Sequence, residues 1–511
     1  MDYPNIQISK QIIVTPYSPV SDQRNEKASH ITIKNEIFSD IEEIEGQITF
    51  SFRNCAFLDT LVISNSDALA FQSISFQFVG CYFKEIEIED IVTDNISFNF
   101  SSSIISGKIS GDKTIIKTDF SNCIFENGLF LMSIHTIAIS YQEEGIYPRI
   151  WNKLFKQMNS EYSESYLELK QSLYIEDPRY FNLNFNETRS VKKGIRKVLS
   201  KQDDTKIGYY LSDYEKGILN INLNLKYSPN SEDVSTKIMS ALLQSLEMSG
   251  SSKGLITIEN SKIDNWYLHE FYPKSEVSVY NINPTATNSN SKIEFHKSNL
   301  DNVWFDNVNF DRYKIISFYR TKFGKTVFTS CNFPNDYIDF ETFKTLENIH
   351  FPEKVTKNFY KDQYEIFIQL KKTMEDSGNY YEALKFQAIS NDTLKKIPGL
   401  QKHDKIILCI NSYSNNHGLS LRRPIQYFFI FSIPLYILYL LSLNRIFNSN
   451  NLDLTLIGYY FSFVDLTHRS DFLVEKEQFN LFSLAIDYLN KIVVGFFIYQ
   501  FIAAFRKYGK R

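Results

Sequence analysis

The side chains that most often carry chemistry do not form a catalytic or metal-binding pattern in this sequence. The eight histidines are scattered along 511 residues, with no His-Glu-x-x-His and no Cys/His spacing suited to zinc. The nucleotide-binding patterns Gly-x-Gly-x-x-Gly and Gly-x-x-x-x-Gly-Lys-Ser/Thr are absent as well. We therefore expect a protein that is not an enzyme and has no catalytic residue, metal site or cofactor.

Carboxylates are plentiful, but their spacing indicates structure. In Glu85-Ile-Glu-Ile-Glu-Asp90 the acids alternate with isoleucine. Alternation with a period of two is typical of a strand with one face in water and one face in a core.

Four of the five cysteines occupy the same place in a repeated pattern, Phe-x-x-Cys-x-Phe. They are Cys55, Cys81, Cys123 and Cys331. The flanking residues are Phe52, Phe57, Phe78, Phe83, Phe120, Phe125, Phe328 and Phe333. A thiol in this fixed place acts as a small packing residue, so we interpret these cysteines as core residues rather than ligands or nucleophiles.

The phenylalanines continue with a period of five. Large apolar residues recur at Phe295, Leu300, Phe305, Phe310 and Ile315, and after a slip of three at Phe318, Phe323, Phe328 and Phe333. A period of five fits neither the 3.6 residues of a helical turn nor the two of a strand. It fits a square coil in which each five-residue side points one large residue inward and stacked coils bury a continuous column.

This pattern resembles the pentapeptide-repeat family, whose fold is a right-handed quadrilateral β-helix with a Phe or Leu centre and a small residue two positions before it. The resemblance implies an irregular first β-helical part at 1–140 and a second part at 251–350. It also implies a β-helix core built from Phe52, Phe57, Phe78, Phe83, Phe120, Phe125, Phe305, Phe310, Phe323, Phe328 and Phe333.

The residue pattern differs in the segments before and after the second β-helical part, 251–350. In 141–250, helical spacing at 150–158 and at Val234, Ile238, Leu242 and Leu246 predicts a mainly helical insert. In 351–420 we expect a helical hairpin with its turn at 376–379, followed by an amphipathic linker. The string from Gln369 through Ala383 is similar to the hairpin that joins the coil to the membrane segments in bacterial membrane-bound pentapeptide-repeat proteins.

Two apolar segments in 421–511 predict a two-helix transmembrane module. Ile425 to Leu443 has 19 residues without a charge, which as a helix span about 28 Å, close to the hydrocarbon thickness of a bilayer. The second span, Leu484 to Phe505, carries Asp487 and Lys491 near its start. They are four residues apart, so we expect them to share one helix face and neutralise each other at the headgroup level.

The basic residues that flank the spans predict their orientation. Lys402, Lys405, Arg422 and Arg423 precede the first span, and Arg506, Lys507, Lys510 and Arg511 follow the second. The connecting loop has more acidic than basic residues. By the positive-inside rule, we expect both chain ends in the cytoplasm. The resemblance to bacterial membrane-bound pentapeptide-repeat proteins implies a multi-pass protein of the bacterial inner membrane.

A third apolar stretch, Leu452 to Phe463, is too short to cross a bilayer and is a candidate re-entrant segment. Its residues Thr455, Gly458 and Tyr459 sit where a two-helix cation channel has its filter. A potassium filter reads Thr-Val-Gly-Tyr-Gly, but Tyr460 occupies the place of the second glycine.

Three functions are compatible with these features. The first is a membrane-anchored cytoplasmic β-helix that acts as a protein-interaction or sensing platform without catalysis, with the lipid bilayer and an unidentified protein as partners. The second is a gated, ion-channel-like homo-oligomer. The third is an inhibitor that mimics DNA, although a net charge of −4 over 511 residues gives little support for mimicry and none for nucleic-acid binding.

Overall fold

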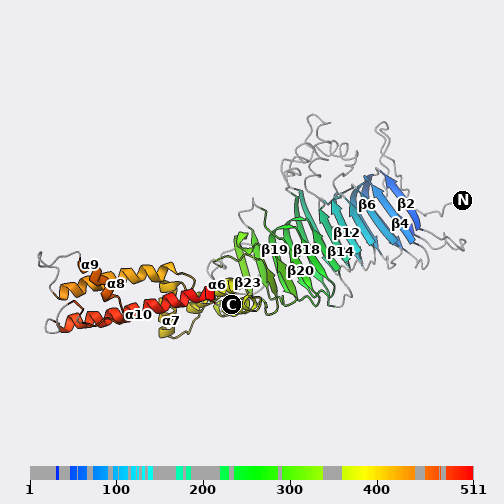
Figure 1. Cartoon of the computed structure of the whole chain (residues 1–511). Helices are drawn as coiled ribbons and strands as arrows, with labels where there is room; N and C mark the ends of the chain where they lie inside the picture. The colour runs from blue at the N-terminus through cyan, green and yellow to red at the C-terminus, as the bar shows by residue number, and fades with distance from the viewer. Residues whose placement is uncertain are drawn as a thin grey trace, which may run out of the picture. The chain divides into compact units, whose positions relative to one another are not determined.

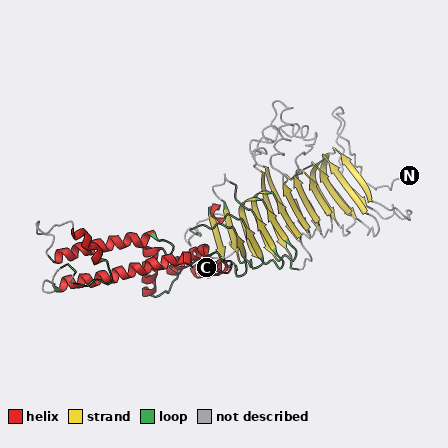
Figure 2. Ribbon diagram, viewed as in Figure 1, coloured by secondary structure: helices red, strands yellow, loops and turns green. Residues whose placement is uncertain are grey.

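The structure of the chain is a computed structural model. It describes residues 30–33, 47–53, 56–65, 73–89, 96–101, 103–112, 117–121, 123–125, 129–132, 136–141, 169–176, 180–185, 219–229, 235–285, 291–335, 337, 359–443, 455–470, 472–473 and 479–509. The chain divides into two compact units, Met1–Ile338 and Asp339–Arg511. The described part of the first unit consists mainly of strands and that of the second mainly of helices (Figures 1 and 2).

The first unit is a β-solenoid, as predicted, in which the chain passes alternately through two sheets. All strand pairs among the described residues are parallel. One sheet contains β1 (His30–Ile33), β3 (Ala56–Asn65), β5 (Tyr82–Glu89), β7 (Ile104–Ile105), β8 (Ile109–Asp112), β10 (Ile124–Phe125), β11 (Leu129–Met132), β13 (Leu169–Glu176), β15 (Leu219–Tyr227), β17 (Leu242–Gly250), β19 (Lys262–Phe271), β21 (Lys292–His296) and β23 (Ile315–Tyr319). The other contains β2 (Gln47–Arg53), β4 (Ser73–Val79), β6 (Ile96–Ser101), β9 (Lys117–Ser121), β12 (Thr136–Tyr141), β14 (Tyr180–Phe185), β16 (Ser235–Met239), β18 (Ile256–Glu259), β20 (Val277–Tyr280), β22 (Val303–Asp306) and β24 (Val327–Thr329).

Residues in the left-handed backbone region form the corners between successive sides of each solenoid coil. They have φ between 48° and 54° and are Ser240, Asn260, Glu270, Asn281, Lys297, Asn307, Arg320 and Ser330. The next residue points inward and is often small, as at Ala241, Ser261, Ser298, Thr321 and Cys331, all of which are buried. At these five corners the small member of the repeat is therefore the first residue that points inward.

The large members of the repeat form columns along the solenoid. The rings of Phe78 and Phe100 stack with centroids 5.0 Å apart, as do those of Phe100 and Phe120. Near the end of the solenoid, Phe305 stacks on Phe328 at 5.3 Å and Phe310 on Phe333 at 4.9 Å. Burying a phenylalanine side chain contributes about 1.5–3 kcal/mol, so these columns are a main source of stability.

The three described cysteines of the pattern fill space beside these columns, and Cys55 lies outside the described residues. The thiol of Cys123 donates to the carbonyl of Phe100 in the preceding turn at 3.4 Å, and Cys331 makes the same contact with Phe305 at 3.4 Å. Burial raises the pKa of the thiols of Cys123 and Cys331 to about 12. Their position agrees with a packing role.

The prediction of helix within 141–250 is wrong wherever the structure describes this segment. Residues 235–239 and 242–250 are strands β16 and β17, and strands β13, β14 and β15 precede them. The predicted helix at 150–158 lies outside the described residues. A spacing of four satisfies the period of a helix and twice the period of a strand, so Ile238, Leu242 and Leu246 could not distinguish the two. The corner at Ser240 and a bulge beside Leu243 then hid the alternation.

The described helices of the second unit are α5 (Phe359–Asp376), α6 (Tyr380–Lys396), α7 (Lys402–Asn415), α8 (Arg422–Ser442), α9 (Thr455–Phe463) and α10 (Leu481–Gly509). Helices α5 and α6 form the predicted hairpin. Its turn uses Gly378 at φ +77°, and Asn379 caps α6 by accepting from the backbone N–H of Glu382 at 3.3 Å.

Candidate functional site

Helices α8 and α10 are long and apolar enough to cross a membrane. The apolar stretches are Arg422–Ser442, 21 residues, and Leu481–Phe505, 25 residues. They contain the second predicted span and all of the first except its last residue, Leu443. In the most apolar 18-residue segment of each helix, only 22% is buried in α8 and 33% in α10. The core helix of a soluble protein buries most of its apolar surface, so these helices do not resemble one.

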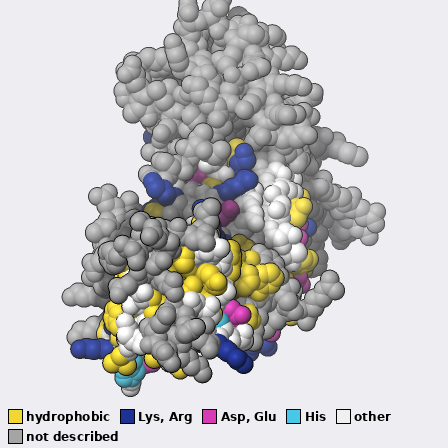
Figure 3. Space-filling view, turned by 60° about the vertical axis from the view of Figure 1, so that its left-hand side comes forward, with side chains coloured by type: hydrophobic (Ala, Val, Ile, Leu, Met, Phe, Trp, Pro, Cys, Tyr) yellow, Lys and Arg dark blue, Asp and Glu magenta, His cyan; other side chains and the backbone are white. Residues whose placement is uncertain are grey.

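Polar and apolar residues of this helix pair are arranged in the reverse of the soluble order. The fully or almost fully buried polar residues are Ser432, Ser483, Asp487, Asn490 and Gln500. The outward side chains include Ile430, Phe431, Ile492, Tyr499 and Ile502, which are between 49% and 70% exposed. Apolar side chains form patches on the described surface in Figure 3. Polar groups inside and apolar groups outside are typical of helices whose surroundings are lipid.

The buried polar groups meet at Asp487, near the start of α10. Its side chain has no exposed surface. The carboxylate faces His468 Nε2 at 2.6 Å through Oδ1, and Oδ2 accepts from Ser470 Oγ at 2.9 Å. Lys491, one turn later on α10, brings its ammonium within 3.3 Å of Oδ2 and donates to the carbonyl of His468 at 3.1 Å. We call Asp487, His468, Ser470 and Lys491 the Asp487 cluster.

Both ring nitrogens of His468 face oxygen atoms. Nε2 faces the Asp487 carboxylate, and Nδ1 faces the backbone carbonyl of Asp465. A neutral imidazole carries one N–H and can donate to only one of these oxygens.

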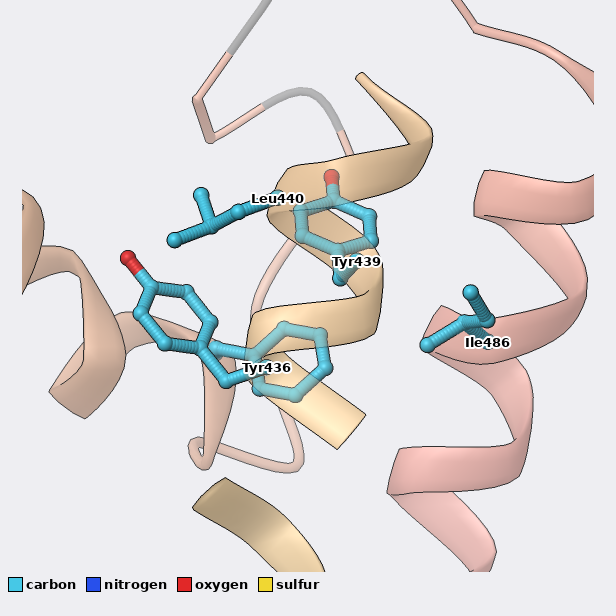
Figure 4. Packing of buried hydrophobic residues seen from close by; sticks show 5 residues of the cluster. Tyr436, Tyr439, Leu440 and Ile486 are labelled. Atoms are coloured by element: carbon cyan, nitrogen blue, oxygen red, sulfur yellow. The ribbon is translucent and has the colours of Figure 1, made fainter. Parts of the chain in front are cut away.

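Aromatic rings pack against the His468 ring of the Asp487 cluster. Figure 4 shows Tyr436 and Tyr439 of α8 with Ile486 of α10. The ring of His468 lies edge-on to Phe472 with centroids 5.1 Å apart. Tyr439 donates to the carbonyl of Ser470 at 3.3 Å, so α8 also holds the segment that supplies the cluster.

The Asp487 cluster does not form a catalytic triad. In a serine hydrolase the histidine lies between serine and carboxylate, whereas here Ser470 and His468 bind different oxygens of the same carboxylate. What the arrangement does is neutralise a buried charge and tie residues 465–470 to α10.

The sequence identified only half of this cluster. Asp487 and Lys491 were predicted to pair on one helix face, and they do. His468 and Ser470 were missed because their contacts bridge 19 and 17 residues of chain. A usable signal was a histidine and a serine just before a span that contains an aspartate.

The candidate filter residues lie within a helix. Thr455, Gly458 and Tyr459 belong to α9, whose backbone carbonyls are engaged in helical hydrogen bonds. A potassium filter instead needs a row of carbonyls directed into a pore. The end of α9 is attached to α10, since Asn490 Nδ2 donates to the carbonyl of Phe463 at 2.7 Å.

Most residues of the predicted β-helix core lie buried in the solenoid. Phe52 is half-buried, while the other ten, Phe57, Phe78, Phe83, Phe120, Phe125, Phe305, Phe310, Phe323, Phe328 and Phe333, are buried. Among the described residues, no group of three or more histidine, cysteine or acidic side chains could hold a metal ion.

The sequence does contain one catalytic-type spacing, since Gly250-Ser-Ser-Lys-Gly254 matches the Gly-x-Ser-x-Gly of a hydrolase nucleophile elbow, and the expectation that no such pattern is present is wrong for this string. Ser252 is fully buried, and its hydroxyl donates to the carbonyl of Gly254 at 3.1 Å. The strand β18 follows it, where an elbow would continue into a helix. Gly250 has a packing reason, since a Cβ there would lie 1.8 Å from the carbonyl oxygen of Tyr227. This motif is a solenoid turn.

A second polar group joins α6 to α7. Asp392 Oδ1 accepts from Ser412 Oγ at 3.3 Å and lies 3.2 Å from Nε2 of the buried His417, and Lys395 also pairs with it. Burial raises the pKa of the Asp392 carboxyl, but hydrogen bonds and charges from His417 and Lys395 outweigh this and lower it to about 2.

Comparisons of the chain with models of known protein families, with curated proteins and with solved structures found no match. Function is therefore inferred from the residues of the two units themselves.

Proposed function

We propose that this chain is a multi-pass protein of the bacterial inner membrane, in which α8 and α10 cross the bilayer and the β-solenoid acts in the cytoplasm as a non-catalytic binding platform. The observation that carries the membrane part is the reversed polarity of the helix pair, with Asp487 and Gln500 inside and apolar side chains outside. The basic flanks, Arg422 and Arg423 before α8 and Arg506 and Lys507 near the end of α10, support cytoplasmic chain ends.

Extraction of membranes at high pH tests the anchor. The full chain should stay in the pellet after carbonate treatment, and a chain lacking 421–511 should move to the supernatant. A substitution of an outward residue, Ile492→Asp, should weaken retention, because a charge at the centre of a span costs about 2.5–3.5 kcal/mol on insertion scales. Release of the full chain by carbonate would refute the anchor.

The platform part is supported by an apolar stripe on the outer face of the second sheet. Trp304 of β22 lies beside Val327 of β24 in register, and Tyr280 of β20 lies one strand away. These side chains are between 40% and 48% exposed. Exposed aromatic residues on a rigid sheet are common at protein interfaces.

Photo-crosslinking in cells tests the stripe. A photoreactive residue at Trp304 should give a discrete protein adduct that is lost when Val327 is changed to Ser. The same residue at the exposed Lys314 serves as the matched control and should give none. Equal adducts at both positions, or none at Trp304, would contradict a platform on this face.

A channel is the second candidate, and one observation favours it. The short α9 lies between the two apolar helices in sequence and packs on α8, where Tyr436 donates to the carbonyl of Leu456 at 2.6 Å. In this case several copies would surround a pore. Ion flux into vesicles that contain a demonstrably oligomeric sample would support the channel, and its absence under all conditions would exclude it.

A further inference from the structure

Helix α7 presents an apolar face to the outside although it lies outside the two spans. Ile406, Ile407, Ile410 and Tyr413 are between 45% and 70% exposed. Their spacing of one, four and seven residues places them on one side of the helix. The opposite side carries Leu408 and Asn411, which are half-buried, and Asn415, which is buried.

The helix is fixed to the membrane pair by polar contacts. Asn415 donates its amide N–H to Gln500 Oε1 of α10, and Gln500 Nε2 donates to Asn411 Oδ1 at 3.3 Å. Arg423, at the start of α8, donates to the carbonyl of Ser412 at 3.0 Å. The exposed face of α7 therefore holds its position at the end of the helix pair where α8 begins.

Basic residues flank this face. Lys402 and Lys405 lie in the first turn of α7, and Arg422 and Arg423 begin α8. The exposed Asp404 is the acidic residue of α7. The local charge is thus positive beside a surface of isoleucine and tyrosine, the composition typical of helices that lie in a lipid interface.

We propose that α7 lies in the headgroup layer of an anionic bilayer, with Ile406, Ile410 and Tyr413 among the acyl chains and its flanking basic residues at lipid phosphates. The proposal rests on the membrane anchor proposed above and extends it, because it assigns a lipid-binding surface to a helix outside both spans. Lipid is the occupant we infer because α7 is joined to the start of α8, where Ile425 and Phe429 are also exposed. The positive charge matches an anionic surface.

The natural Cys409 allows a direct test. It is the exposed cysteine among the described residues, while Cys81, Cys123 and Cys331 are buried. In a Cys55→Ser variant of the full chain, Cys409 is labelled with the environment-sensitive dye NBD and the protein is reconstituted in phosphatidylcholine vesicles with or without phosphatidylglycerol. Some vesicles carry bromine on the acyl chains about 5–10 Å below the headgroups, the depth at which interfacial helices bury their apolar face.

If α7 lies in the lipid, the dye at Cys409 emits at blue-shifted wavelengths and bromine quenches it. The double substitution Ile406→Glu with Ile410→Glu should abolish both effects. Replacing Lys402 and Lys405 by Gln should abolish the increase in quenching that phosphatidylglycerol causes. Emission from water without quenching, or quenching equal in the two lipids, would overturn the proposal.

Two matched positions separate this outcome from failure of the anchor itself. With Cys409 changed to Ser, a dye at Ile430→Cys of α8 reports the span, and a dye at Ser377→Cys in the α5–α6 turn reports a site away from lipid. Quenching at 430 without quenching at 409 would refute the α7 surface and leave the anchor standing. Absence of quenching at 430 would refute the anchor.

Discussion

At the scale of single residues, the most informative feature is a carboxylate buried in an apolar helix pair. Asp487 has three polar neighbours, of which His468 and Lys491 can carry positive charge. An ionised group at such a site is stable only while its partners remain. The Asp487 cluster thus explains how a span tolerates two charged residues.

Replacing Asp487 by Leu should destabilise the helix pair by up to about 3 kcal/mol, because it leaves the half-buried Lys491 ammonium without its carboxylate. The thermal unfolding midpoint of the full chain in detergent micelles measures this. The double variant Asp487→Leu with Lys491→Leu is the control, and it should recover most of the loss. A double variant that is as unstable as the single one would contradict the assigned pairing.

The contact between α6 and α7 should depend on acid pH. The folded-state pKa of Asp392, about 2, lies below the ordinary value of 3.8. The carboxylate therefore stabilises the fold above about pH 4, and this contribution is lost as the pH falls from about 4 to 2. In thermal unfolding, Asp392→Asn should lose less stability than the natural chain over this interval. Parallel pH profiles of the two proteins would show that Asp392 does not contribute.

At the scale of elements, the solenoid depends on corner residues with a left-handed backbone conformation, which costs most residue types conformational free energy. Ser330 has φ 51° and leads into the buried Cys331. The left-handed region is open to glycine and unfavourable for β-branched residues. Corner residues therefore limit which sequences can form this coil.

Glycine and valine should have opposite effects on stability at the corner residue Ser330 and at the strand residue Val327. Ser330→Gly should leave the unfolding midpoint unchanged or raise it, and Ser330→Val should destabilise by about 1–2 kcal/mol. At the exposed strand residue Val327 glycine should instead destabilise by up to about 1 kcal/mol. The same order of glycine and valine at both positions would contradict the corner assignment.

Sequence alone predicted the elements whose pattern has one physical interpretation. A period of five fits neither a helix nor a simple strand, so the solenoid was predicted. A run of 19 uncharged residues before Asn444 has few structural alternatives to a long apolar helix, so the apolar helices were predicted as well. Residues 235–250 were predicted wrongly because their spacing of four fits two structures. The Asp487 cluster was incomplete because contacts across a loop leave no periodic trace.

At the scale of the whole molecule, the two units call for different surroundings. Among the described residues, the solenoid buries most of its phenylalanines and its cysteines Cys81, Cys123 and Cys331. Helices α8 and α10 instead expose apolar side chains. In the proposed arrangement the solenoid lies in water and helices α8 and α10 lie in lipid. The chain should therefore be oriented, with one end of the helix pair on each side of a membrane.

The orientation can be read with single cysteines. In a chain whose exposed Cys409 and whose Cys55 are changed to Ser, we expect Ser377→Cys to be protected from a membrane-impermeant maleimide in spheroplasts and Arg469→Cys to react. Permeabilising the membrane should make both react. Reaction at 377 before permeabilisation would reverse the proposed topology.

The Asp487 cluster also constrains how the chain enters a membrane during synthesis. When α10 leaves the translocation machinery, Asp487 and Lys491 can pair with each other, but Asp487 gains its contacts with His468 and Ser470 only when residues 465–470 are folded against α10. A lone α10 would carry the Asp487–Lys491 pair into lipid without the hydrogen bonds from residues 465–470. We expect α8 to wait in the channel or beside it until α10 emerges, so that the two helices are released to lipid as one hairpin.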